Sequence, residues 1–491
     1  MGGSSFAASR TQTMSSANPD HRVTKRGLWA LAATAACFSC FLSAQNTPTP
    51  PPSPQQSNSA LFQGSVASGA VSAQTLDLTL DDAIQRGIRN NLGIILSGTQ
   101  ASGARGQRLS QLQSLLPSVD LNATVSVQEV DLAAEGLRIP GIPTVIGPFG
   151  YVDLRGKLSW TLVNVNSLRA YLASRHNFNA AQLTAQDAHD LVVLTAGNAY
   201  LLVLADESLI NSTEAQAATA KVSLDQAVAN HQAGTAPLLD ELRARVDLQS
   251  LEQQLIAARN ALEKDKLSLA RVIGLPLEQK FNLVDKVPYS AFDQPDIAAT
   301  IAQAQANRKD LAAQAEQTRV AEEQRKAATA DRYPTLKFDG DYGDIGVTLG
   351  HSHGTGDASG TISVPLFKEF EFRGEADVAQ SQLDTARAQL SDIHAQVEAD
   401  VRDALLDIAS AQQQVEVARS NVELANEALS EAQQRYKAGV SDNLAVSDAQ
   451  QSLAQANDRY VASLYRHNVA KLSLARALGD GKNYKTYLGG K

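Results

Sequence analysis

The sequence predicts a mainly α-helical chain with membrane β-barrel strands, in which a helix, a strand pair and a long helical hairpin occur twice. The first observation is an internal repeat, because Lys266–Arg271 (KLSLAR) recurs unchanged as Lys471–Arg476, 205 positions later. The second is the alternation of apolar and polar residues in four short segments. The third is the absence of proline from 167–231 and 369–437. A duplicated helical protein explains all three.

Composition excludes one class of partner. The chain has 491 residues, and 43 Lys and Arg against 52 Asp and Glu give a net charge of −9. A nucleic-acid-binding protein needs a basic face to offset phosphates, so we expect no nucleic-acid partner. Aromatic residues make up only 5% of the chain. That scarcity suits long packed helices better than bulky globular cores.

The first 44 residues resemble a secretory signal peptide. Basic residues precede an apolar run at 27–42, and the small Ala44 marks the expected cleavage point. An uncleaved anchor helix and a lipid on Cys37 remain alternatives. Cleavage would remove both cysteines, Cys37 and Cys40. No later segment has 18 consecutive apolar residues, so we expect no transmembrane helix after it.

The domain boundaries follow from the repeat. Residues 45–75 are rich in Pro and Ser and are expected to form a linker. The first structural repeat is expected over 76–285 and the second over 286–480, followed by a tail at 481–491. Each repeat should begin with one helix, at Leu80–Leu115 and Ile297–Arg332. The prolines that follow, Pro117 and Pro334, forbid another turn.

Four strands are predicted, at about 118–129, 151–163, 335–343 and 359–367. Each alternates between an apolar and a polar face, which is the pattern of membrane strands and also of half-buried strands in a soluble sheet. No apolar helix is placed to cover the oily face, so we favour the membrane. The polar faces carry charged residues suited to a watery lumen: Asp153, Arg155, Lys157, Lys337, Asp339 and Asp341.

A long helical hairpin follows each strand pair. The four helices are expected at 167–231, 236–273, 369–437 and 441–478. Apolar or small residues step by three and four from Leu383 to Tyr436, which is a heptad seam with one irregularity. Gly234 and Gly439 should reverse the chain between the helices of each hairpin. At 1.5 Å per residue, such helices are about 100 Å long.

Four strands are too few to close a barrel, and lipid does not tolerate open strand edges. The chain must therefore associate. Two copies would supply eight strands and a filled interior, and three would supply twelve and a wider lumen. The charged lumenal faces favour a trimeric 12-stranded barrel, which the helices would extend as a periplasmic α-helical tunnel. A signal peptide followed by such a barrel indicates the outer membrane.

Short motifs and their order resemble the TolC-like outer-membrane efflux protein family. They include Arg435–Gly439 (RYKAG), Leu444–Gln450 (LAVSDAQ), and Val364–Phe367 (VPLF) followed by Arg373 and Ala379. The resemblance covers roughly residues 76–480. It implies a homotrimer in outer-membrane lipid that docks a periplasmic adaptor (membrane fusion) protein joined to an inner-membrane pump of the RND, ABC or a similar class. It also implies passive export of drugs, metals, metabolites or polypeptides by efflux or type I secretion.

The resemblance also suggests a periplasmic gate. Tyr436, Asp240 and Asp448 match family positions where aspartates and a tyrosine close the tunnel, and an Asp–Tyr hydrogen bond there would hold a helix pair inward. Ser441 and Ala445 stand where the family has an arginine and another aspartate, so the network departs from the family pattern. Simple packing or solvated helix-start charges would also account for these residues. Gly234 and Gly439 would mark the adaptor-docking tips, or would only end helices.

No catalytic site is expected. His351 and His353 lie in a glycine-rich stretch that we expect to be an external loop, and the sequence supplies no third metal ligand beside them. The sequence has no nucleophile elbow, phosphate loop or Cys/His cluster, so we expect neither cofactor nor metal, and no enzyme. The alternative function is a periplasmic coiled-coil adaptor or scaffold. The cargo and the class of pump stay open.

Overall fold

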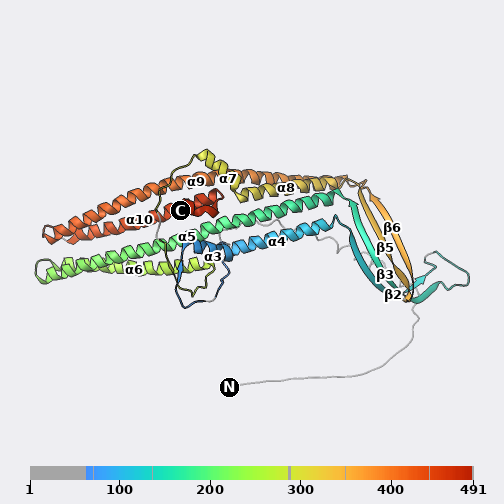
Figure 1. The fold of residues 1–491 in the computed structure, drawn as a ribbon, viewed down its shortest axis with the longest axis horizontal. Coiled ribbons are helices and arrows are strands. Elements are labelled where there is room, and N and C mark those ends of the chain that lie inside the picture. Colours follow the sequence, from blue (N-terminus) through green and yellow to red (C-terminus); the bar gives the residue numbers. More distant parts are fainter. Residues whose placement is uncertain are drawn as a thin grey trace, which may run out of the picture. The chain divides into compact units, whose positions relative to one another are not determined.

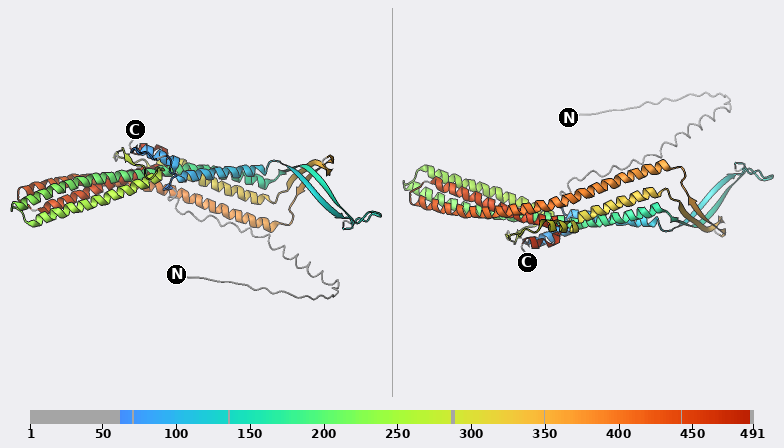
Figure 2. Two further views of the ribbon diagram at one scale, coloured as in Figure 1. Left: turned by 90° about the horizontal axis from the view of Figure 1, so that it is seen from below. Right: turned by 90° about the horizontal axis from the view of Figure 1, so that it is seen from above.

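The structure is a computed structural model that describes residues 62–69, 71–134, 136–285, 289–348, 350–441 and 443–488. The expected signal peptide, with Cys37 and Cys40, lies outside the described residues. Within the described part, the four long strands lie at one end and the turns of the two helical hairpins lie at the other (Figures 1 and 2). Shorter helices and the core lie between them.

The helices follow the repeat. In the first repeat they are α3 (Leu80–Asn90), α4 (Leu92–Gln113), α5 (Val165–Gln232) and α6 (Leu238–Ile273). In the second they are α7 (Ile297–Asn307), α8 (Lys309–Ala330), α9 (Glu369–Lys437) and α10 (Asn443–Ala477). A short 3-10 helix (Gly481–Asn483) and α11 (Tyr484–Leu488) occupy the expected tail.

The strands form two sheets. The four long strands are β2 (Ser118–Asp131), β3 (Val145–Val163), β5 (Thr335–Thr348) and β6 (His351–Ser363). They form one antiparallel sheet in the order β2-β3-β5-β6, which leaves an edge of β2 and an edge of β6 unpaired among the described residues. Two short strands, β1 (Leu76–Leu78) and β4 (Phe281–Leu283), pair in parallel and join the start of the first repeat to its end.

The core lies at the middle of the molecule, where the long helices of the hairpins pack against the shorter helices. One apolar cluster joins α3, α5, α6, β1 and β4 to α10 and α11, with Tyr200 and Leu269 fully buried. A second joins α7, α8, α9 and α10 around Val397 and Val401. The two repeats are therefore packed into one core, in which α5 contacts α10.

The first helix of each repeat is broken, which corrects the prediction of single helices at Leu80–Leu115 and Ile297–Arg332. Asn91 and Arg308 are extended, with ψ of 132° and 125°. Both side chains are buried and hold tertiary partners. Asn91 donates to the Phe62 carbonyl at 2.7 Å, and Arg308 is ion-paired with Asp310 and Asp400. These contacts outweigh helix propensity.

The strands are longer than expected, and the expected loop containing His351 and His353 is wrong, because both residues belong to β6. Glycines on one face of β6 conceal the alternation. They also make room for the Tyr342 ring of β5, since a Cβ on Gly354 would lie 2.7 Å from the Tyr342 hydroxyl. Strand β6 ends at Ser363 instead of 367, near Pro365, which has no N–H to donate.

The packed part of the chain starts earlier than the linker at 45–75 predicts. Phe62 is buried against Ala188 and Val192 of α5. The backbone N–H of Val66 donates to Asn90 at 2.9 Å, and that of Leu92 donates to Gly64 at 2.9 Å. A composition rich in Pro and Ser predicts an exposed linker, and it does not reveal that backbone hydrogen bonds hold the last part of this segment.

Among the described helices, α5 is long and apolar enough to cross a membrane. The sequence does not indicate this, because α5 contains no uninterrupted run of 18 apolar residues. The core helix of a protein has the same properties, and 61% of the apolar stretch is buried inside this one. The stretch contains Val193, Ala196 and Leu204, which belong to the central core cluster.

Candidate functional site

The two hairpin turns are built alike. Each long helix ends in a Schellman motif, with Gly234 at φ 71° and Gly439 at φ 70°. In the first turn Gly234 donates to His231 and Thr235 donates to Asn230, both at 2.9 Å. The corresponding bonds close the second turn at 3.0 Å. A Cβ on either glycine would meet nothing within 4 Å, so the backbone conformation, not crowding, demands glycine.

Tyr436 lies one turn before its hairpin tip and is half-buried. Its hydroxyl lies 3.5 Å from the amide nitrogen of Asn230 on α5. The described residues thus give Tyr436 an amide partner instead of the expected aspartate. The contact still joins the second hairpin to the first.

The two candidate aspartates differ. Asp240 is buried in the first turn of α6, where a helix N-terminus favours its charge. Its backbone carbonyl accepts from the buried Asn443 amide of α10 at 3.3 Å. Asp448 is exposed on α10, and its carbonyl accepts from Ser452 of the same helix. Asp240 therefore belongs to the contact between the hairpins, and Asp448 lies outside it.

Two further contacts between the hairpins are not predicted by any sequence pattern. Ser447 of α10 donates to the Asp247 carboxylate of α6 at 2.5 Å, and Gln450 donates to the Ser223 hydroxyl of α5 at 3.0 Å. We call the four pairs together the inter-hairpin latch: Asn230–Tyr436, Asp240–Asn443, Ser223–Gln450 and Asp247–Ser447. A comparison of the repeats could have found it, since Asn443 and Ser447 replace Leu238 and Leu242.

The first hairpin is also braced within itself. The His231 ring nitrogen lies 3.0 Å from the Glu241 carboxylate across the turn, and Arg245 donates to the same carboxylate at 2.6 Å. The second repeat has Val446 and Gln450 at the positions of Glu241 and Arg245. The two tips therefore share one backbone conformation but carry different charged side chains.

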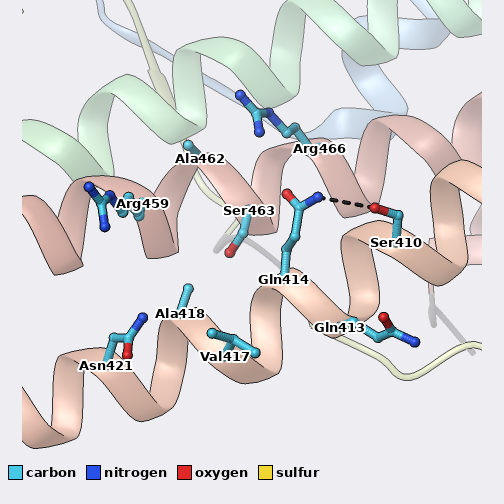
Figure 3. Close-up of a pocket in the computed structure, with 10 residues that line it drawn as sticks. All are labelled: Ser410, Gln413, Gln414, Val417, Ala418, Asn421, Arg459, Ala462, Ser463 and Arg466. Atoms are coloured by element: carbon cyan, nitrogen blue, oxygen red, sulfur yellow. Dashed lines mark hydrogen bonds between the residues drawn. The ribbon is translucent and has the colours of Figure 1, made fainter.

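A groove of about 580 Å³ lies between α9 and α10, away from the tips (Figure 3). Arg459 and Arg466 line it from α10, and a Gln414–Ser410 hydrogen bond of 3.1 Å lies on α9. Val417 at its edge is 61% exposed. A single chain thus leaves a polar and apolar helical face open to a neighbour.

The four-stranded sheet has one apolar and one charged face. On β2 the side chains of Val119, Leu121, Val125 and Val127 are 73–78% exposed. The opposite face carries ion pairs, among them Lys337–Asp339 at 2.9 Å and the pairs of Arg155 with Asp153 and Asp341. An apolar surface open on one face and charge on the other is the pattern of membrane strands.

The described residues contain no group of three or more His, Cys, Asp or Glu side chains placed to hold a metal ion. His351 and His353 stand two positions apart on one strand and therefore share a face. The His351 ring is 3.3 Å from the Thr348 hydroxyl.

Comparisons with known proteins agree on one kind of molecule. A family model described as outer membrane efflux protein matches residues 100–275 and 300–480. The probable efflux pump outer membrane protein TtgC and the antibiotic efflux pump outer membrane protein ArpC, both of Pseudomonas putida, are 22% identical over 422 residues. These matches cover 82% of the chain and 84% of each relative.

Solved structures show the same fold. The outer membrane protein VceC of Vibrio cholerae has a TM-score of 0.72 at 19% identity, covering 82% of this chain and 96% of VceC. The CmeC outer membrane channel of Campylobacter jejuni has a TM-score of 0.72 at 18% identity, covering 87% and 95%. The match to the family model extends over both repeats and includes the four long strands and the hairpins.

Proposed function

Because the chain belongs to the outer membrane efflux protein family, we propose that it is the outer-membrane exit duct of an efflux pump, conducting cargo passively from the periplasm to the cell exterior. The resemblance that the sequence predicted is confirmed. The protein is an outer-membrane channel with a periplasmic helical region. The adaptor alternative is not favoured, because the family model matches both repeats.

The working unit in this proposal is a homotrimer with a 12-stranded barrel. The observation that carries it is a sheet of four strands with an apolar outer face and two edges that no described residue pairs with. Lipid cannot satisfy such edges, so β6 of one copy must pair with β2 of the next. The open groove between α9 and α10 would then face the neighbouring copy's helices.

The partners in this proposal are a periplasmic adaptor and an inner-membrane pump. The tips at Gly234 and Gly439 would meet the adaptor, because they lie at the end opposite the membrane strands (Figure 1). The relatives are named as toluene, solvent and antibiotic efflux pump components. We therefore propose small organic compounds as the cargo. A channel needs no catalytic residue, and we assign none.

The gate in this proposal is the inter-hairpin latch. While its bonds hold, the second hairpin stays against the first and narrows the periplasmic end. Tyr436 and Asp240 contribute to it, whereas the exposed Asp448 would act only through its charge on the lumen. Opening would require the hairpins to separate at the tips while the core holds their roots.

Membrane fractionation tests the proposal. The mature protein should require detergent for extraction and should migrate as a trimer in unheated SDS gels and as a monomer after boiling. It should also conduct ions in planar bilayers. A water-soluble monomer would overturn the assignment.

A further inference from the structure

The strand register aligns charges across the sheet. Asp120 of β2 pairs with Lys157 of β3, Lys157 pairs with Asp341 of β5, and Asp341 pairs with Asp357 of β6. Residues directly opposite one another across an antiparallel ladder share a face. One transverse row therefore crosses all four strands with three carboxylates and one ammonium group.

Arg155 lies next to this row and reaches three strands. Its guanidinium contacts Asp153 of its own strand at 3.3 Å, Asp341 of β5, and the Thr355 hydroxyl of β6 at 2.9 Å. The Arg155 side chain is only 19% exposed. One cation thus joins β3, β5 and β6 and offsets two carboxylates at once.

Arg155 is one of the few cations that offset the aspartates of this face. Between the strand irregularities near each hairpin end, the polar face carries five aspartates, at positions 120, 153, 339, 341 and 357. It carries three Lys or Arg residues, at positions 155, 157 and 337, together with His353. The face is therefore mildly negative with Arg155 and more negative without it.

We propose that Arg155 sets the charge selectivity of the barrel lumen. This rests on the proposed function, in which the polar face of the sheet lines the pore. With Arg155 in place, the lumen favours small cations and cationic organic compounds only weakly, so that anionic cargo also passes. Without Arg155, the released Asp153 and Asp341 would make the lumen strongly cation-selective.

A cysteine probe measures the potential at this site without depending on the gate. Ser359 faces the lumen two residues from Asp357 and pairs with Asp339. In Ser359→Cys, the rates of thiol modification by cationic ethylammonium and anionic ethylsulfonate methanethiosulfonates are measured from the external side. The same chain without the added cysteine shows any background from Cys37 and Cys40. The ratio of the two rates reports the local potential.

The expected changes have opposite signs. A unit charge about 7–10 Å from the thiol changes each rate roughly twofold in 10 mM salt, and so changes the ratio roughly threefold to fivefold. Arg155→Gln should raise the cationic preference by about that factor, and Arg155→Lys should restore it. Asp341→Asn should lower it, which keeps the test valid if Arg155→Gln does not assemble. Arg402→Gln, which removes an arginine bonded to a carboxylate on α9 outside the strands, should change nothing.

The results separate this inference from the proposed function. If Ser359→Cys reacts with both reagents and its ratio ignores Arg155 and Asp341, the selectivity role is wrong and the channel stands. If Ser359→Cys is inert while a cysteine at Val125 on the apolar face reacts, the face assignment fails and the proposed pore fails with it.

Discussion

Ser447→Ala tests whether the inter-hairpin latch holds the channel closed. The Ser447 hydroxyl donates to the Asp247 carboxylate at 2.5 Å, which joins α10 to α6 near the tips. The substitution removes this bond and leaves the helical backbone of α10 unchanged. Alanine is also the better helix former, so loss of helix does not confound the result.

The magnitude follows from the kind of bond. A hydrogen bond to a charged group contributes about 1.5–3 kcal/mol net. Asp247 is half-buried and regains water when the partner is lost, so we expect about 1–1.5 kcal/mol per protomer. Each protomer's balance between closed and open then shifts roughly tenfold. If three protomers open together, the shifts multiply.

Single-channel recording in planar bilayers measures this shift as open probability. Cells carrying the variant should also admit a large antibiotic that the outer membrane normally excludes. Tyr436→Phe with Asp240→Ala should leak as well. Asp240 holds Asn443 through its backbone, however, so most of that effect should come from the loss of the Tyr436 hydroxyl.

The matched control is Ser452→Ala, five residues farther along α10. Its hydroxyl donates to the Asp448 carbonyl of the same helix at 2.8 Å, and within the described part of the chain it bonds to no other helix. The control should conduct like wild type. If Ser447→Ala and Ser452→Ala are both indistinguishable from wild type while trimers form normally, the latch is not the gate.

Two further perturbations address the tips and the hairpin root. Gly234→Val or Gly439→Val should abolish complementation of an efflux-deficient strain without reducing outer-membrane trimer, because a positive φ costs a branched residue about 1–2 kcal/mol. The control Ala438→Val should be tolerated. Loss of trimer in the glycine variants would instead mean that these glycines serve folding. Burial, and a hydrogen bond that the protonated Asp206 carboxyl donates to the Asp265 carboxylate, raise the pKa of Asp206 to about 7, so stability present at low pH is lost as pH rises through 7. Asp206→Asn should therefore raise Tm relative to wild type by an amount that grows from pH 4 to pH 7 and then levels off, and a gain independent of pH would contradict the shared proton.

Periodic features were predictable from the sequence. Helix α9 occupies the proline-free range 369–437 that contains the heptad seam, and α5 differs from the predicted range by two residues at one end and one at the other. The spacing of apolar residues and the glycine at a turn are both local features, so a single sequence is enough to predict the helices and turns that they produce. The breaks at Asn91 and Arg308 depend on partners far away in sequence, and no local pattern encodes them.

The latch shows the same limit at the site. Tyr436 and Asp240 were placed by resemblance, and the resemblance supplied an aspartate partner that the described residues do not give to Tyr436. The pairs Ser447–Asp247 and Gln450–Ser223 are 200 and 227 residues apart in sequence. Only the packing of one hairpin on the other brings them together.

The duplicated KLSLAR motif shows how one sequence serves two environments. Lys266 of the first repeat is partly exposed and forms an ion pair with Glu207 at 3.0 Å. Its counterpart Lys471 is fully buried and donates to the Ser290 carbonyl at 2.5 Å. Burial lowers the pKa of Lys471 to about 8. Because its ammonium group loses a proton more readily than that of an ordinary lysine, a single neutral acceptor leaves less charge uncompensated at Lys471.

The difference follows from topology. A duplicated chain has two hairpins but only one connection between its repeats, and Ser290 and Phe292 of that connection contact the second hairpin. There Gln412, the counterpart of Glu207, accepts from the Phe292 backbone at 3.2 Å, beside the Ser290 carbonyl held by Lys471. A glutamate could accept the same bond, but it would bring a charge into a clasp made of backbone groups. The first repeat keeps the charged pair, so the two halves diverge where the connection between them is packed.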